Sequence, residues 1–182
     1  MSLPAYILET GNAVASPELI SEVEQRLYRE MRYLDDEEYR KWTGMMTDDV
    51  HYFMPGIETV YRRNKMDQLN DLSRMAFYND NLEELGKRID RLETGTAWSE
   101  DPATRYCHII SNIEVETTDN PDEVLVYSNF LVYRNRLARD EDTLIGNRKD
   151  IWRREEGVLK LAKRRILLKQ NVLISKNLNV YF

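Results

Sequence analysis

The sequence has few of the residues from which metal and redox sites are built. Its 182 residues include one cysteine, Cys107, and two histidines, His51 and His108. A single cysteine excludes an internal disulfide, a four-cysteine zinc site and an iron–sulfur cluster held by several cysteines of this chain. The seven glycines form neither a Gly-x-x-x-x-Gly-Lys loop nor a Gly-x-Gly-x-x-Gly turn. The usual phosphate-binding loops are therefore missing, and no nucleotide cofactor is expected.

Long apolar runs and an excess of positive charge are also missing. No apolar run reaches the eighteen or so residues that a membrane span needs, and the first residues do not combine the charged and apolar regions of a secretory signal. We therefore expect a cytoplasmic protein that does not contact a membrane. The formal net charge of −6 has the wrong sign for a protein whose main task is to bind nucleic acid, so no nucleic-acid partner is expected.

The composition is that of a globular chain with a core, because 42% of the residues are hydrophobic and 32% are charged. We expect residues 1–15 to form an N-terminal arm and residues 16–182 to form a single domain. Residues 1–122 carry 13 basic and 25 acidic side chains, a net charge of −12, whereas residues 123–182 carry 13 and 7, a net charge of +6. The simpler interpretation is that the two parts neutralise each other within one fold; a purpose-built partner surface is the alternative.

Two helices are predicted near the N-terminus. Ser16 followed by Pro17 is typical of a helix N-cap and first helical position, and apolar residues recur at spacings of three and four from Ile20 to Leu34. A second helix is predicted to begin at Asp35, with Glu38 completing a capping box.

A short strand and a third helix are predicted next. Val50, Tyr52 and Met54 alternate with His51 and Phe53, after the break expected at Asp48-Asp49 and before Pro55-Gly56. The pair Asp80 and Glu83 predicts a helix start, and Gly95 can end that helix.

The rest of the chain is predicted to be strand and turn. Four long runs lie at about residues 104–117, 123–138, 143–155 and 158–173. Their connections are too short for parallel crossovers, so neighbouring strands should be antiparallel. A long twisted sheet must curl or bulge to stay packed on one side. The predicted fold is α+β, a long, strongly curved antiparallel sheet wrapped around N-terminal helices in the shape of a cone.

The chain has enough histidines for a mononuclear iron site, but their spacing in the sequence does not support one. His51 and His108 could combine with Asp48 or Asp49 as a two-histidine, one-carboxylate iron site, yet the two histidines lie on separate predicted strands. We expect the two histidines to occupy ordinary polar positions of the sheet and to bind no metal.

Cys107 precedes His108, but neighbours on a strand point to opposite faces, so the two do not form a nucleophile and its base. A buried thiol is expected.

A cone can also enclose a pocket for acid–base chemistry on a small molecule. His108, Tyr52 and Asp49 are the candidates, and a stand-alone hydratase or isomerase is the alternative function. Against it, the eleven tyrosines are spread through the chain, which is more typical of sheet faces and interfaces.

The basic stretches 153–154 and 163–165 are divided between two strand faces, which favours salt bridges over phosphate binding.

Several segments together carry a resemblance to a known family. They are Leu34–Trp42, Asp48–Tyr52, Met54-Pro55, Tyr61–Arg63, Leu92–Pro102, Ser111-Asn112, Ser128–Arg136 and Asn177–Phe182. The most specific are Thr-Gly-x-Ala-Trp at residues 94–98 and Asn-Phe-x-x-Tyr-Arg-x-Arg at residues 129–136. With these segments, nearly the whole chain resembles the small, or β, subunit of aromatic-ring-hydroxylating dioxygenases of the Rieske type.

The resemblance implies both a fold and a role. The fold would be the cone shared with scytalone dehydratase, ketosteroid isomerase and the nuclear transport factor. The role would be that of a structural β subunit, packed as a trimer beneath three large α subunits in the terminal oxygenase. The Rieske [2Fe-2S] cluster and the mononuclear Fe(II) would lie in the α subunit, with no catalytic, cofactor-binding or metal-binding residue in this chain. The assembly would convert arenes to cis-dihydrodiols with dioxygen and NAD(P)H electrons, in aromatic hydrocarbon catabolism.

Contacts between subunits are expected at arginine and aromatic positions, because Arg, Trp and Tyr are frequent interface anchors. The candidates are Trp98, Arg105, Tyr106, Arg134, Arg136, Arg148 and Phe182. The competing interpretation is that Arg134 and Arg136, on one face of a strand, pair only with the acidic helices of their own chain. Cys107 and Lys169 depart from the family pattern, where a basic and an acidic residue are frequent, so individual ion pairs are not carried over.

Overall fold

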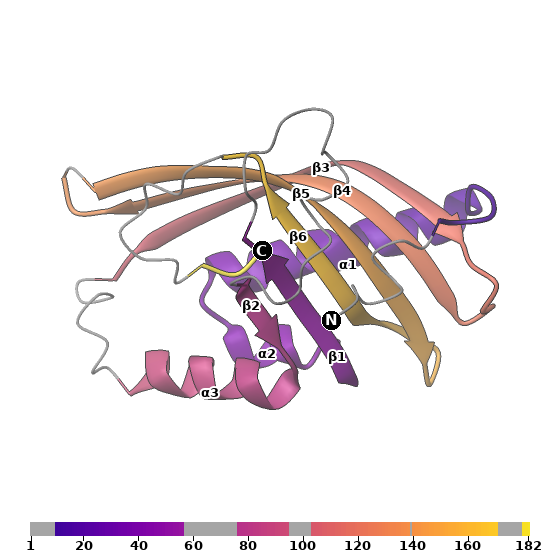
Figure 1. Ribbon diagram of the computed structural model, residues 1–182, viewed down its shortest axis with the longest axis horizontal. Helices are drawn as coiled ribbons and strands as arrows, with labels where there is room; N and C mark the ends of the chain where they lie inside the picture. The colour runs from indigo at the N-terminus through magenta and orange to yellow at the C-terminus, as the bar shows by residue number, and fades with distance from the viewer. Residues whose placement is uncertain (1–9, 57–75, 95–102, 139, 171–179) are drawn as a thin grey trace.

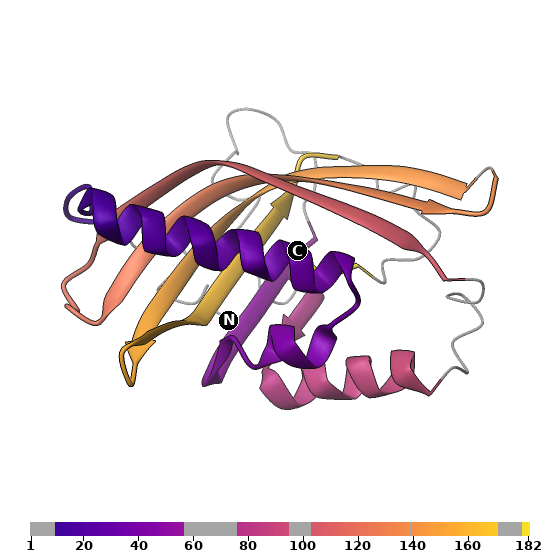
Figure 2. The ribbon, with the colours of Figure 1, turned by 180° about the vertical axis from the view of Figure 1, so that it is seen from behind.

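The computed structural model describes residues 10–56, 76–94, 103–138, 140–170 and 180–182. Its helices are α1 (Pro17–Asp35), α2 (Tyr39–Thr43) and α3 (Leu82–Glu93), and its strands are β1 (Met46–Pro55), β2 (Ala76–Asp80), β3 (Arg105–Thr117), β4 (Glu123–Arg136), β5 (Asp140–Glu155) and β6 (Val158–Leu168). The strands form one sheet in the order β2-β1-β6-β5-β4-β3 (Figure 1). Figure 2 shows the sheet arching over α1, with α2 and α3 together at one end. Within the described residues, none of the helices has the length and apolar character needed to cross a bilayer.

The curved α+β architecture is confirmed, and the sheet is mixed in one place. The four long strands β3 to β6 pair with their sequence neighbours in antiparallel fashion, as their short connections predicted. The pairing of β1 with β6 is parallel, with His51 opposite Lys163, which corrects the prediction of a wholly antiparallel sheet. The chain between β1 and β6 contains α3 and three long strands, so it is long enough for a parallel pairing that a tight turn forbids.

The predicted first helix is confirmed, but the predicted start of the second helix at Asp35 was wrong. The Ser16 hydroxyl accepts a hydrogen bond from the Leu19 amide at 3.3 Å, as an N-cap should. The helix then continues through Asp35, and α2 begins four residues later without a side-chain cap. The Asp35 carboxylate does not cap α2 because it accepts the His108 amide of β3 at 3.0 Å. Glu37, with φ of 56°, makes the turn between the helices.

The strand β1 and the helix α3 differ from the predictions by a few residues. Asp48 and Asp49 lie within β1 with exposed side chains and do not break it. The N-cap of α3 is Asn81, which forms a complete capping box with Glu84. Asp80 instead ends β2 and accepts Arg88 Nε at 2.6 Å. The predicted helix stop, Gly95, lies outside the described residues.

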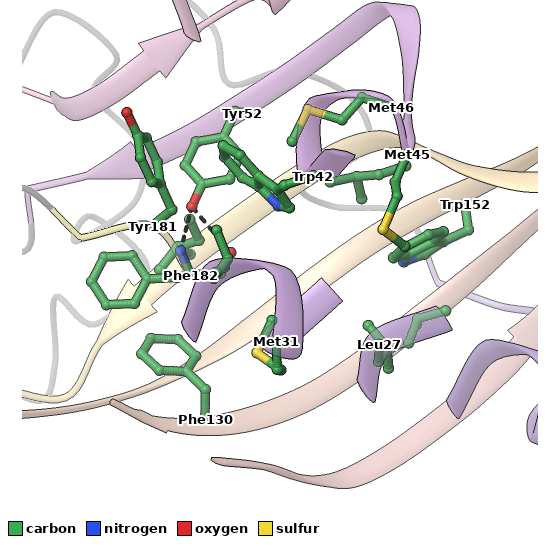
Figure 3. Close-up of a cluster of buried hydrophobic side chains, with 14 of the residues drawn as sticks. Leu27, Met31, Trp42, Met45, Met46, Tyr52, Phe130, Trp152, Tyr181 and Phe182 are labelled. Carbon is green, nitrogen blue, oxygen red and sulfur yellow. Dashed lines mark hydrogen bonds between the residues drawn. The ribbon is translucent and has the colours of Figure 1, made fainter. Parts of the chain in front are cut away.

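One apolar core joins the helices to the concave face of the sheet. It includes residues of α1, α2 and α3 and of all six strands, and Ala15 and residues 180–182 belong to it. Trp42 and Trp152 have no exposed surface, and Figure 3 shows them with Leu27 and Met31 of α1. The apolar stripe of α1 therefore packs where its period predicted.

Candidate functional site

The interior of the cone holds four charged side chains beneath α1. Glu30, Arg148, Asp150 and Arg164 are each at most 1% exposed. Glu30 lies three residues after Leu27, so it points from α1 toward the sheet. Arg148 and Asp150 are two residues apart on β5 and share a face, and Arg164 on β6 is the cross-strand partner of Asp150. The sheet register and the helix period together bring two positive and two negative charges into one buried cluster.

The cluster is centred on Arg164. Its guanidinium donates to both carboxylate oxygens of Asp150, at 3.0 and 2.7 Å, and its Nη2 donates to Glu30 Oε2 at 2.9 Å. Glu30 also accepts Trp42 Nε1 at 3.0 Å and Arg148 Nη1 at 3.4 Å. Buried charges are tolerated when they are paired and hydrogen-bonded in this way, so the cluster is a self-neutralising part of the core.

The pKa shifts follow from this pairing. Burial by itself raises the pKa of Glu30, but the attraction of Arg164 and Arg148 outweighs it and holds the pKa below the ordinary value. Burial by itself lowers the pKa of Arg164, but Asp150 and Glu30 outweigh it and the pKa is raised. Burial and the nearby Arg164 lower the pKa of Arg148, and within the described residues its Nη2 has no hydrogen-bond partner. Arg148 is therefore the least satisfied member of the cluster.

Residues 180–182 occupy the space next to this cluster. The Tyr52 hydroxyl donates to the Phe182 carbonyl at 3.0 Å and accepts the Phe182 amide at 2.7 Å (Figure 3). Arg164 Nη1 donates to the same carbonyl at 2.6 Å. The Tyr78 hydroxyl donates to the Val180 carbonyl at 2.9 Å. The interior of the cone is thus filled by the chain itself.

His108 lies at the rim of this interior, beside a small hollow that is open to solvent. The hollow is lined by Leu34, Tyr39, Tyr106, His108, Val180 and Tyr181. His108 Nδ1 is 2.6 Å from Asp35 Oδ1, and Nε2 is 2.9 Å from the Tyr181 carbonyl oxygen. Both ring nitrogens are therefore engaged by the protein, and neither faces the hollow without a partner.

The acid–base trio considered from the sequence is not assembled. His108 pairs with Asp35, whereas Asp49 binds Arg153 Nη1 at 2.9 Å on another part of the sheet. Tyr52 is bonded to residue 182, and burial raises the pKa of its hydroxyl well above the ordinary value. The structure therefore corrects the grouping of His108, Tyr52 and Asp49 as one pocket.

Sequence reasoning missed four residues as site residues, of which one had a visible signal: Glu30, Asp150 and Arg164 of the buried cluster and Asp35 beside His108. Glu30 interrupts the apolar stripe of α1 on its buried face, and an acid at such a position predicts a buried partner. Asp35 had no comparable signal, because its partner His108 lies 73 residues away.

The two histidines are not brought together. His51 Nε2 is 2.8 Å from Asn79 Oδ1, and the ring stacks on Phe53, whereas His108 is held by Asp35. In the part of the chain that the structure describes, no three His, Cys, Asp or Glu side chains are grouped as metal ligands.

Cys107 is exposed, which corrects the prediction of a buried thiol. Alternation on β3 turns His108 inward and therefore Cys107 outward.

Ion pairs connect the acidic and basic parts of the chain, as the charge distribution predicted. Arg154 Nη2 binds Glu22 of α1 at 2.7 Å, and Arg153 binds Asp49 of β1. With Arg164 and Glu30 in the core, these pairs show the two parts neutralising each other within one fold.

The interface candidates occupy different environments. Arg105 is exposed, and Tyr106 lines the hollow. Arg134 is 5% exposed, and its guanidinium lies 3.6 Å from Asp140 and 3.5 Å from Asp142. These acids belong to β5, and not to the helices that the competing interpretation named.

The other interface candidates include two in the core. Arg136 is partly exposed. Arg148 and Phe182 are 1% and 0% exposed, so both lie inside their own chain. Trp98 lies outside the described residues.

The sequence matches the family described as ring hydroxylating beta subunit over residues 29–175. It is 37% identical to the biphenyl 2,3-dioxygenase subunit beta of Rhodococcus jostii over 98% of this chain and 97% of that protein. It is 39% identical to the 3-phenylpropionate/cinnamic acid dioxygenase subunit beta of Photorhabdus laumondii over 92% of this chain and 93% of that protein.

Solved structures agree in fold. A chain of naphthalene 1,2-dioxygenase with indole bound in the active site superposes with a TM-score of 0.83 at 25% identity, over 98% of this chain and 93% of that one. A Novosphingobium aromaticivorans structure named for scytalone dehydratase superposes with a TM-score of 0.61 at 14% identity, over 83% and 84% of the chains, and shows the cone fold alone. The family match, the relatives and the fold converge, and the chain belongs to the β-subunit family of ring-hydroxylating dioxygenases.

Proposed function

We propose that this chain is the structural β subunit of the terminal oxygenase of an aromatic-ring-hydroxylating dioxygenase. Its task is to support iron-bearing α subunits that convert arenes to cis-dihydrodiols with dioxygen and NAD(P)H electrons. The observation that carries the proposal is the family match, which covers residues 29–175. The filled interior supports it, because the buried charge cluster and residues 180–182 occupy the space in which a cone-shaped enzyme would hold a substrate.

The residues of this chain do not fit the cofactors of such an oxygenase. A Rieske centre takes two cysteines and two histidines, and the chain has one cysteine and two histidines. His51 and His108 have separate partners in the fold, so they do not form the two-histidine part of an iron site. We therefore assign the Rieske [2Fe-2S] cluster and the mononuclear Fe(II) to the α subunit, and derive no catalytic step from this chain.

The proposed assembly contains three β and three α subunits and works in the cytoplasm, where reduced nicotinamide is produced. Within it, residues 16–182 act as one domain and residues 1–15 as an N-terminal arm, of which Ala15 packs into the apolar core. We place subunit contacts at Arg105, Tyr106 and Arg136, together with Trp98.

Arg134 is only 5% exposed and lies beside Asp140 and Asp142 of its own chain. Like Arg148 and Phe182, it therefore offers little surface to a partner subunit, and we place no contact there.

Co-expression with an α subunit that carries the Rieske cysteines and histidines tests the proposal. The expected result is a complex with equal numbers of the two chains by native mass spectrometry, with all iron in the α subunit. The isolated β chain should then contain no stoichiometric iron and should not oxidise an arene. A folded β chain that fails to bind any such α subunit, or that binds iron lost on His51→Ala or His108→Ala substitution, contradicts the proposal.

The assembled enzyme also separates the structural role from the acid–base alternative. His108→Gln in the β subunit should leave turnover within a few-fold of the parent complex, since loss of a general acid or base costs about a hundredfold or more. A loss of that size in kcat, with assembly, iron content and melting temperature unchanged, would establish a catalytic role for His108.

A further inference from the structure

Residues 180–182 are held in the interior by contacts of the kind that hold a bound ligand. Their side chains enter an aromatic environment, with the Tyr181 ring 4.7 Å from Trp42 and the Phe182 ring 5.0 Å from Phe130, measured between centroids. Val180, Tyr181 and Phe182 are all at most 5% exposed. The segment therefore contributes two aromatic rings and one aliphatic side chain to the interior.

Among the described residues, the backbone of the segment is contacted by side chains. Tyr78 of β2 binds the Val180 carbonyl, and His108 of β3 contacts the Tyr181 carbonyl. At residue 182, Tyr52 of β1 contacts both the amide and the carbonyl, and Arg164 of β6 donates to the same carbonyl. All three carbonyl oxygens thus have partners from four different strands.

We propose that the interior of the cone is a peptide-binding site, and that residues 180–182 are its ligand, bound in cis. The site takes a short extended peptide with two consecutive aromatic residues, of which the second packs its ring on Phe130 while Tyr52 binds its backbone. Hydrogen bonds to the main chain supply affinity and pockets for side chains supply specificity, as in other modes of peptide recognition. The proposal does not depend on the role of the chain in an oxygenase.

A small arene is a poor occupant of the same site. The hydroxyls of Tyr52 and Tyr78 and the guanidinium of Arg164 are buried donors, and an arene offers them no acceptor. Leaving buried donors unpaired costs more than the lost hydrogen bonds alone. A peptide satisfies these donors with its carbonyl oxygens, and the geometry therefore favours a peptide.

The test uses the full chain with a weakened internal ligand. Phe182→Ala should lower the melting temperature by roughly 10 °C, because a buried aromatic ring is removed from a chain of this size. The probe is the synthetic peptide acetyl-Leu-Asn-Val-Tyr-Phe-amide, which has the sequence of residues 178–182. Adding it at millimolar concentration should raise the melting temperature saturably, because the free peptide competes with a tethered segment that has lost its second ring. The same peptide with alanine at both aromatic positions should have no effect.

Matched hydroxyl deletions show whether the proposed side chains recognise the peptide. In the Phe182→Ala background, Tyr78→Phe should weaken peptide binding roughly tenfold in Kd, the consequence of one unpaired buried carbonyl. Tyr133→Phe removes a hydroxyl that is bonded to Glu141 at the surface, and should leave Kd within twofold.

Two results would overturn the proposal. The first is a folded Phe182→Ala chain whose melting temperature does not respond to the peptide at millimolar concentration. The second is an equal effect of Tyr78→Phe and Tyr133→Phe on peptide binding. If Phe182→Ala does not fold, Phe182→Leu takes its place with the same peptides and the same criteria, because it removes less buried surface.

Discussion

Replacing Glu30 by glutamine removes a buried negative charge while keeping the shape of the side chain. Glu30 balances Arg164 and Arg148 in the interior, where it accepts Arg164 Nη2 at 2.9 Å and Trp42 Nε1 at 3.0 Å. In the variant, Asp150 alone faces two buried guanidinium groups. Each carboxylate oxygen of Glu30 accepts two hydrogen bonds, and the amide NH2 of glutamine cannot accept any, so the network loses two bonds as well as a charge.

The magnitude follows from the burial of the group. Removing one partner of a buried ion pair typically costs about 3–5 kcal/mol, because the remaining charge stays buried without compensation. Glu30 and Arg164 are 1% and 0% exposed, so solvent screening does not reduce this figure. For a chain of this size, each kcal/mol changes the melting temperature by about 2–4 °C. Glu30→Gln should therefore lower the melting temperature by roughly 6–20 °C.

Urea unfolding at several pH values provides the assay. The pKa of folded Glu30 lies below its ordinary value of 4.5, so its stabilisation is fully present above pH 4.5 and is lost as the pH falls through the lower, folded-state pKa. The difference in free energy of unfolding between the parent chain and Glu30→Gln should be largest near neutral pH and should shrink below pH 4.5.

A control at a similar pair completes the design. Glu22 binds Arg154 at 2.7 Å, but both side chains are more than a third exposed, so Glu22→Gln should cost only about 0–1 kcal/mol. Equal effects of the two substitutions at pH 7 would refute the argument from burial. A Glu30→Gln penalty that does not change with pH would refute the argument from its ionisation.

Other substitutions test the local structure and the proposed assembly. Asn81→Ala should lower the free energy of unfolding by about 1 kcal/mol in urea titrations, because the capping box with Glu84 is lost; no change would contradict the role of this cap. Gly146→Ala should cost about 1–3 kcal/mol in the same assay, since its new Cβ would overlap the Phe130 ring and the Leu167 carbonyl oxygen, and a neutral result would mean that the core yields there. Arg105→Glu, at an exposed position, should weaken co-purification with the α subunit while the isolated chain keeps its melting temperature; unchanged assembly would remove Arg105 from the proposed interface.

Local signals in the sequence determined most of the secondary structure. The Ser16 cap and the apolar stripe that follows predict α1, and the short polar links between the long strands predict their antiparallel order. These features depend on residues close together in the chain, where helix period, capping and turn length act directly. The family resemblance likewise depends on sequence alone, because its motifs are contiguous segments.

The tertiary structure alone decided which distant residues meet. The sequence predicted Asp35 as the cap of the next helix, but in the fold Asp35 binds the amide and ring of His108 on β3. The parallel pairing of β1 with β6 depends on a connection of about a hundred residues. The burial of Arg164 beside Glu30 likewise depends on how α1 crosses the sheet. Such contacts are set by the global packing of the chain, because a charged side chain finds its partner only after the core has brought separate elements together.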